Sequence, residues 1–353
     1  MSIAKQSEKI LKAFLPTPFT IAVLLTFFTF LLALIITEPK TEENHFLQLL
    51  SFWEKGIWNS PLLVFAIQMM LMLVLGHTLA LSRPIDKMIS KAVKYCTRTS
   101  NAAAIITFST ILVSLLNWGL GLIFGAIFAR KVGEYASVKN IKLNYPLIGA
   151  AGYSGLMVWH GGISGSAPIK IAEDGHFLAE KIGVISQSET IFSTMNIGIS
   201  IVLLIALPLL MYYLGKKKPG EAITISSAIT LDEKGRITGA ERLDHSFLLA
   251  WIFGGLILFY AFYKAIIIPE NISFSVISPN YINLILLGTA IVMHKNFFTF
   301  LKAVDSAIIG ASGILIQFPL YFGIMGIMNH SGMVDIISNF FVNISNEITF
   351  PIF

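Results

Sequence analysis

Long apolar runs separated by short charged loops make up most of the chain. The first run, residues 18–37, contains 20 residues and no charged side chain. Because an α-helix of about 20 apolar residues spans the hydrocarbon core of a bilayer, this run predicts a membrane-spanning helix. Similar runs predict further spanning helices at residues 62–81, 145–159, 190–214, 246–263, 276–293 and 306–328.

One apolar segment, residues 101–129, is too long for a simple crossing. As a helix it would measure about 45 Å, against a hydrocarbon core of about 30 Å. Basic residues flank it on both sides, although Lys and Arg concentrate on the cytoplasmic side of membrane proteins. We therefore predict a re-entrant hairpin over residues 101–130, turning between Asn117 and Gly121. The flanking residues are Arg83, Lys87, Lys91, Lys94, Arg98, Arg130, Lys131, Lys139 and Lys142.

Composition agrees with a membrane protein. Hydrophobic residues make up 55% of the chain and charged residues 13%, whereas soluble domains contain about 25% charged residues. With the hairpin and a cytoplasmic N-terminus, 20 of the 25 Lys and Arg residues fall inside. Topology therefore explains the net charge of +5, and we expect a lipid bilayer and no nucleic acid as partner. Cys96 is alone, which excludes an intrachain disulfide and a multi-thiolate metal site.

The only long polar stretch, residues 215–245, predicts a cytoplasmic linker within a single membrane domain, residues 1–353. It separates a first half, residues 1–214, from a second half, residues 246–353. The run at 306–328 in the second half is interrupted by glycines and Pro319. Interrupted helices in both halves are typical of secondary transporters built from inverted repeats. The predicted fold is an all-α integral membrane protein, a polytopic helical bundle with a re-entrant hairpin and interrupted helices.

Three motifs follow one another along the chain: LLNWGLGLIFGAIFARKV, HGGISGSAPIK and GILIQFPLYFGIMGIMNHSG. Together they resemble the short-chain fatty acid transporter family, whose members are implicated in uptake of small monocarboxylates such as butyrate and acetoacetate. The resemblance implies a multi-pass secondary carrier in a bacterial-type cytoplasmic (inner) membrane, working by alternating access. Its substrate would be a small carboxylate.

The resemblance also implies a missing segment. Family members continue beyond the position of Phe353 through a second Asn-containing, Gly-rich segment with a Pro-Ser-Gly-Gly-Gly core. We therefore expect a C-terminally truncated member with an incomplete second half. The alternative to a carrier is a truncated, non-transporting membrane protein or half of a split transporter. A homo-oligomer or a separately encoded C-terminal half would then complete it.

A short carboxylate needs hydrogen-bond donors for its charged end and an apolar wall for its tail. Broken helix ends offer backbone N–H groups and a partial positive charge. In the break at residues 160–168, glycines allow close backbone approach and serines supply hydroxyls. An ordinary extramembrane turn is the alternative for this segment. The candidate substrate residues here are Gly161, Gly162, Ser164, Gly165 and Ser166.

The hairpin turn supplies a second set of candidates, whose residues also have structural explanations. The Asn117 amide can donate and accept, and Trp118 can wall the tail, although a tryptophan also suits packing or the membrane interface. Gly121 begins a small-xxx-small spacing that favours helix packing. Gln317 in the later run suits either a substrate contact or an interhelical hydrogen bond. These candidates are Asn117, Trp118, Gly119, Gly121 and Gln317.

Coupling and catalysis leave few signals in the sequence. His160 beside the Gly-rich break is the candidate for proton coupling, with packing as the alternative, because imidazole titrates near neutral pH. Sodium bound by backbone carbonyls would leave no pattern, so H⁺ and Na⁺ both stay open as coupling ions. No Walker motif, HExxH pattern or complete nucleophile elbow is present. We expect no enzyme activity, no metal site and no cofactor.

Overall fold

The computed structural model describes residues 15–40, 42–176, 178–217, 220–222, 225, 239–269, 273–346 and 349. Within these residues the regular structure is helical, and the one β-type pairing is an isolated bridge between Leu143 and Glu221. The predicted all-α fold is confirmed. Most of the expected linker, residues 215–245, and the basic residues Lys5, Lys9 and Lys12 lie outside the described residues.

Six helices in the described part of the chain are long and apolar enough to cross a membrane. This finding agrees with a polytopic membrane protein. They are α2 (Pro18–Ile36), α4 (Ser60–Ala80), α6 (Thr99–Leu116), α11 (Thr194–Lys217), α13 with its π-helical extension η3 (Phe247–Ile267) and α15 (Phe297–Ser331). The other helices are α3 (His45–Ile57), α5 (Arg83–Val93), α7 (Trp118–Val138), α8 (Tyr145–Tyr153), η1 (Ser154–Met157), η2 (Trp159–Gly161), α9 (Ser166–Ile171), α10 (Ala179–Ile182), α12 (Glu241–Asp244), η4 (Phe274–Val276), α14 (Pro279–His294) and α16 (Met333–Ile344).

The chain divides into two compact units. The first consists of Met1–Ile67 and Ser312–Phe353, and the second of Gln68–Ala311. In the first unit, α2, α3, α16 and the C-terminal part of α15 enclose a small core. The buried side chains of that core are Ala33, Leu49, Ile327 and Met333.

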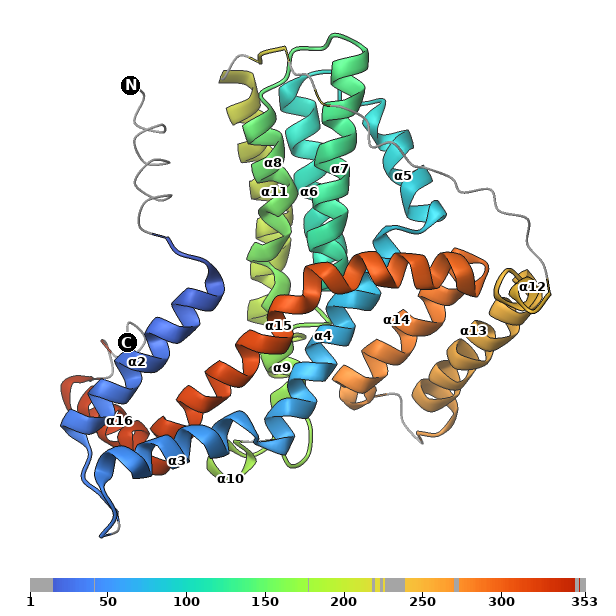
Figure 1. Cartoon of the computed structure of the whole chain (residues 1–353). Coiled ribbons are helices and arrows are strands. Elements are labelled where there is room, and N and C mark those ends of the chain that lie inside the picture. The colour runs from blue at the N-terminus through green and yellow to red at the C-terminus, as the bar shows by residue number, and fades with distance from the viewer. Residues whose placement is uncertain are drawn as a thin grey trace. The chain divides into compact units, whose positions relative to one another are not determined.

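The second unit contains four helices that lie side by side, α6, α7, α8 and α11 (Figure 1). Helix α5 packs against α7, and α13 pairs with α14. The largest core of this unit lies where α5, α6, α7 and α8 meet, and Phe128 and Ile106 are almost fully buried there. A well-packed hairpin therefore supports the segments that follow α6 and α8.

The prediction of a membrane-spanning helix at residues 145–159 is wrong. Helix α8 ends at Tyr153 and is followed by the short turns η1 and η2. Nine helical residues extend only about 14 Å, roughly half of the hydrocarbon core. The run is apolar because Ile148 and Ala151 are fully buried against the hairpin helices, and an apolar pattern alone does not separate a core helix from a span.

A helical hairpin is present, and its turn is tighter than expected. Asn117 alone separates α6 from α7, so Gly119 and Gly121 lie in the first turn of α7 rather than in the loop. The arms extend for about 27 Å and about 32 Å, as long as the bilayer core. A hairpin of this length returns the chain to its starting side whether the arms cross the core fully or partly. Re-entrance itself stays a prediction.

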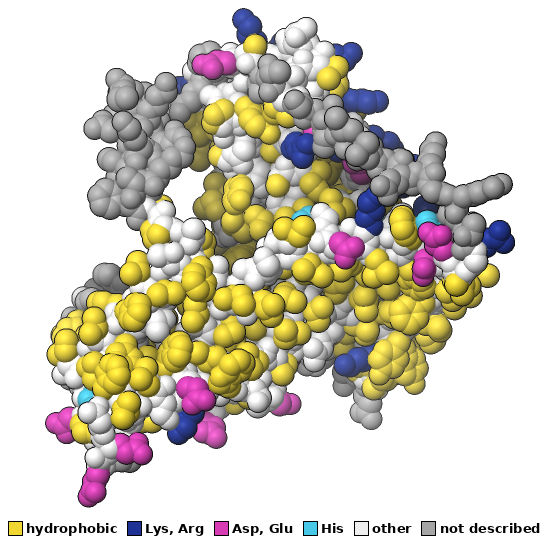
Figure 2. Space-filling view, in the orientation of Figure 1, with side chains coloured by type: hydrophobic (Ala, Val, Ile, Leu, Met, Phe, Trp, Pro, Cys, Tyr) yellow, Lys and Arg dark blue, Asp and Glu magenta, His cyan; other side chains and the backbone are white. Residues whose placement is uncertain are grey.

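Apolar side chains are exposed along the long helices. On α13, Trp251, Phe253, Leu256 and Phe259 are each about half exposed or more, and Figure 2 shows hydrophobic side chains gathered over this helix. Lys and Arg side chains instead gather at one end of the bundle of α6, α7, α8 and α11 (Figures 1 and 2). Exposed apolar surface of this extent is suited to contact with lipid.

Candidate functional site at the hairpin tip

Asn117 forms the tip of the hairpin by ending one helix and capping the next. Its backbone is extended, its N–H donates to the Val113 carbonyl at 3.0 Å, and its Oδ1 accepts from the Leu120 N–H at 2.7 Å. Asparagine is a favoured N-cap because its side-chain oxygen satisfies an N–H that has no partner inside the helix. Helix α4 crosses the tip at Gly76, where a Cβ would lie 2.6 Å from Asn117 Oδ1. The tip therefore caps α7 and packs closely against α4.

Ser164 connects the hairpin tip to the Gly-rich break. Its Oγ accepts the backbone N–H of Trp118 at 2.9 Å, and the residue is fully buried. The neighbouring Ile163 N–H donates to the Leu115 carbonyl at 2.8 Å, just before the hairpin turn. Two segments that are 46 residues apart in sequence, counted from Trp118 to Ser164, are thus held together by two hydrogen bonds.

Two donors at this junction lack acceptors in the described part of the chain. They are Asn117 Nδ2 and Trp118 Nε1, on side chains that are 3% and 9% exposed. The Trp118 ring lies edge-on to Trp159, with the ring centroids 5.2 Å apart. An unsatisfied buried donor costs about 1–3 kcal/mol, and an acceptor bonded to either donor would remove that cost.

The backbone N–H groups of the three glycines in the Gly-rich break are already engaged. The N–H of Gly161 donates to Val158 at 3.0 Å, that of Gly162 to Trp159 at 3.3 Å, and that of Gly165 to Gly162 at 2.9 Å. These bonds form a succession of tight turns that the glycines permit. These three N–H groups are therefore not free to bind an anion.

The glycines of the hairpin turn have packing explanations. A Cβ at Gly119 would come within 2.9 Å of the Leu73 Cα in α4. A Cβ at Gly121 would collide with the Ser114 hydroxyl and lie 2.7 Å from the Ser114 Cα in α6. Close helix packing, the alternative given above for Gly121, is what the geometry favours for both residues.

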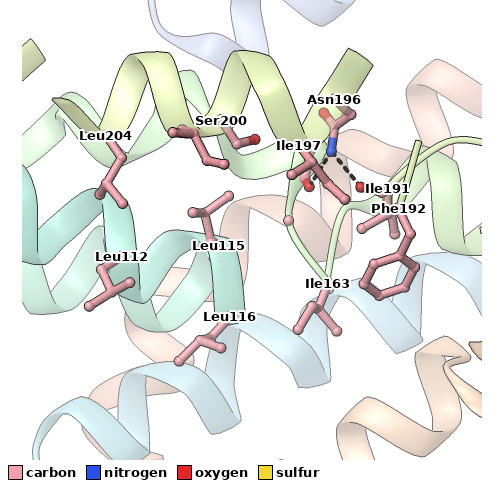
Figure 3. Close-up of a pocket in the computed structure, with 13 residues that line it drawn as sticks. Leu112, Leu115, Leu116, Ile163, Ile191, Phe192, Asn196, Ile197, Ser200 and Leu204 are labelled. Carbon is pink, nitrogen blue, oxygen red and sulfur yellow. Dashed lines mark hydrogen bonds between the residues drawn. The ribbon is translucent and has the colours of Figure 1, made fainter. Parts of the chain in front are cut away.

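An apolar pocket of about 270 Å³ lies next to this junction, between α6, the Gly-rich break and α11 (Figure 3). Asn196 on α11 closes one end, and its Nδ2 donates to the carbonyls of Gly161 at 2.9 Å and Ile191 at 2.7 Å. The volume is just below the range of about 300–1,000 Å³ typical of ligand pockets, which suits a small solute. The lining residues are Leu112, Leu115, Leu116, Gly161, Gly162, Ile163, Ile191, Phe192, Asn196, Ile197, Ser200, Ile201 and Leu204.

The remaining candidates lie at the edge of this cluster or outside it. Ser166 is half-buried at the first position of α9. His160 is exposed and contacts the Trp159 ring, and partial burial lowers the pKa of His160 below its ordinary value. Gln317 lies on α15 in the other unit, two residues before Pro319.

The comparison with protein families matches residues 2–353 to a family described as short chain fatty acid transporter. The chain belongs to the short-chain fatty acid transporter family. Two curated relatives are provisionally named as short-chain fatty acid transporters. The protein from Escherichia coli (strain K12) is 32% identical over 357 residues, which cover 99% of this chain and 77% of the relative. The protein from Haemophilus influenzae (strain ATCC 51907 / DSM 11121 / KW20 / Rd) is 34% identical over 356 residues, which cover 96% and 75%. No solved structure matches the chain.

Family membership confirms the resemblance and indicates a transporter rather than an enzyme. The expectation of a truncated member is not borne out, because the family match extends from residue 2 to residue 353. That expectation depended on a second Gly-rich segment beyond Phe353, whereas the family match concerns residues 2–353. The six long apolar helices and the family together give a multi-pass membrane protein.

Proposed function

We propose that this protein is a secondary transporter that moves butyrate-like or acetoacetate-like monocarboxylates across a bacterial-type cytoplasmic membrane by alternating access. The proposal places the N-terminus in the cytoplasm and the substrate carboxylate at the hairpin tip. The observation that supports this placement best is the pair of buried donors, Asn117 Nδ2 and Trp118 Nε1, that lack acceptors in the described part of the chain.

The chemistry of a short carboxylate fits the two parts of the junction. Its oxygens accept hydrogen bonds and would occupy the donors of Asn117 and Trp118, and bonds to charged acceptors are about twice as strong as neutral ones. Its short tail needs an apolar wall, and Leu115, Leu116 and Ile163 line the adjacent pocket. Leu116 directly precedes Asn117, and Ile163 directly precedes Ser164, so the two parts are contiguous along both segments.

Alternating access requires that a site can be released as well as formed. The junction is held by few bonds, chiefly the Ser164 to Trp118 and Ile163 to Leu115 hydrogen bonds and the Asn196 contact with Gly161. Small changes between α11, the Gly-rich break and the hairpin tip would therefore open or close the apolar pocket. We infer that these segments form the moving boundary of the site.

The test is uptake of labelled butyrate into liposomes under imposed proton or sodium gradients. The decisive variant is Asn117→Asp, which keeps the capping oxygen of α7 but removes the donor and adds a negative charge. The matched control is Asn144→Asp, because Asn144 caps α8 in the same way, with Oδ1 accepting from Leu147 N–H at 3.2 Å.

We expect gradient-driven uptake by the unmodified protein and by Asn144→Asp, and loss of at least about 90% of it in Asn117→Asp, equivalent to about 1.4 kcal/mol. The gradient that drives uptake identifies the coupling ion. Equal uptake by the two variants would remove the hairpin tip from the substrate site. No uptake by correctly inserted unmodified protein would contradict the transport proposal itself.

A further inference from the structure

A second, polar pocket lies in the unit formed by Gln68–Ala311, and its lining residues differ from those of the apolar pocket. It has a volume of about 660 Å³ and is lined by residues of α4, of the segment 172–187 and of the segment 275–280 at the start of α14. Its lining is rich in oxygen-bearing side chains, including two carboxylates, and no Lys or Arg is among the lining residues that the structure describes. The oxygen-bearing lining residues include Gln68, Glu173, Asp174 and Asn280.

Two amide oxygens at the contact between α4 and α14 are buried without a donor among the described residues. They are Gln68 Oε1 and Asn283 Oδ1, on side chains that are 5% and 8% exposed. The nitrogens of both amides are occupied, since Gln68 Nε2 donates to Asn280 Oδ1 at 3.0 Å and Asn283 Nδ2 donates to the Gln68 carbonyl at 2.9 Å. Both free atoms are therefore acceptors, and Gln68 also lines the polar pocket.

The charge around the pocket indicates which ligand these acceptors suit. Glu173 pairs with Lys170 at 2.6 Å, which neutralises one carboxylate, whereas Asp174 is exposed and forms no ion pair with another described residue. Hard cations prefer oxygen ligands, and divalent calcium sites usually draw on several carboxylates. No cluster of three or more His, Cys, Asp or Glu side chains suited to a metal ion occurs in the described part of the chain.

We propose that this polar pocket binds an alkali-metal cation, with the Gln68 side-chain oxygen as a ligand at its buried end and Asp174 supplying the compensating charge. Neutral amide oxygens with a single uncompensated carboxylate match one positive charge better than two. The proposal concerns binding alone, so its failure would leave the carboxylate site at the hairpin tip unaffected.

The experiment measures equilibrium binding of radiolabelled Na⁺ to the purified full-length protein in a buffer whose only other cation is N-methylglucamine. Gln68→Leu removes the buried oxygen, and Gln68→Glu restores an oxygen with added charge. Asp174→Asn removes the proposed charge without disturbing a buried group. Its matched control is Glu180→Gln, which makes the same charge change at an exposed residue of the same segment outside the pocket lining.

We expect saturable Na⁺ binding that Gln68→Leu and Asp174→Asn each weaken by about tenfold or more, equivalent to about 1.4 kcal/mol. Gln68→Glu and Glu180→Gln should each keep at least about one half of the Na⁺ affinity of the unmodified protein. If Gln68→Leu fails to fold, the comparison of Asp174→Asn with Glu180→Gln decides the question alone. Absence of saturable binding, equal affinity in those two variants, or displacement of Na⁺ by equimolar Ca²⁺ would overturn the proposal.

Discussion

The bond between Ser164 and Trp118 allows a quantitative test of the hairpin junction. Ser164→Ala removes the hydroxyl that accepts the Trp118 N–H at 2.9 Å, in a site where Ser164 is fully buried. The two side chains are similar in size, so little packing is lost. The N–H group would be left buried without an acceptor, at a cost of about 1–3 kcal/mol.

That free energy should appear in both stability and uptake. A free-energy change of about 1–3 kcal/mol changes an equilibrium constant by roughly 5- to 150-fold. The ratio of protein with a formed junction to protein with an open junction should fall by that factor. The assays are thermal unfolding of the purified protein and the initial rate of butyrate uptake in liposomes. Helix content measured by circular dichroism should not change, since no intrahelical bond is removed.

Ser166→Ala is the matched control because Ser166 lies two residues away and is half-buried at the start of α9. We expect its unfolding temperature and uptake rate to stay near those of the unmodified protein. If Ser164→Ala and Ser166→Ala behave alike in both assays, the Ser164 hydrogen bond does not organise the site, and the account of the junction is wrong.

Three further predictions follow from single contacts. Trp118→Phe removes the free indole donor and should raise the KM for butyrate by about tenfold, whereas Trp159→Phe should change the KM little; equal KM values in both variants would exclude the donor role. Gly125→Ala should lower the free energy of unfolding by about 1–3 kcal/mol, because the added Cβ would collide with the backbone of α8. Its control, Gly149→Ala, has open space around the added Cβ and should be neutral or stabilising by up to about 1 kcal/mol. Burial raises the pKa of the Cys96 thiol to about 12, so maleimide at neutral pH should label this residue only after unfolding, and rapid labelling of folded protein would contradict its burial.

The sequence predicted the helical membrane fold because spanning helices require long apolar runs that few soluble proteins contain. Residues 18–37 and 62–81, for example, correspond closely to α2 and α4. The same criterion failed at residues 145–159, where apolar side chains pack against protein. The two environments select the same side chains, so composition alone could not separate them.

The sequence also indicated where the helices break, at Asn117 and at residues 160–168, because glycine and asparagine interrupt apolar helices for recognisable reasons. It could not show that Ser164 accepts from the Trp118 backbone or that the backbone donors of Gly161 and Gly162 are engaged. Those facts depend on contacts between distant segments. Asn196 was missed, although a polar residue at the start of an otherwise apolar run was a usable signal.

The most direct test of the central claim is equilibrium binding of butyrate to the purified protein, compared with its neutral analogue butyramide, by isothermal titration calorimetry. The two solutes have nearly the same shape, but only butyrate presents two charged acceptors to the donors of Asn117 and Trp118. We predict saturable binding of butyrate that is at least about tenfold tighter than that of butyramide, with the difference abolished in Asn117→Asp and kept in Asn144→Asp. Equal binding of the two solutes by the unmodified protein would contradict a carboxylate site at the hairpin tip.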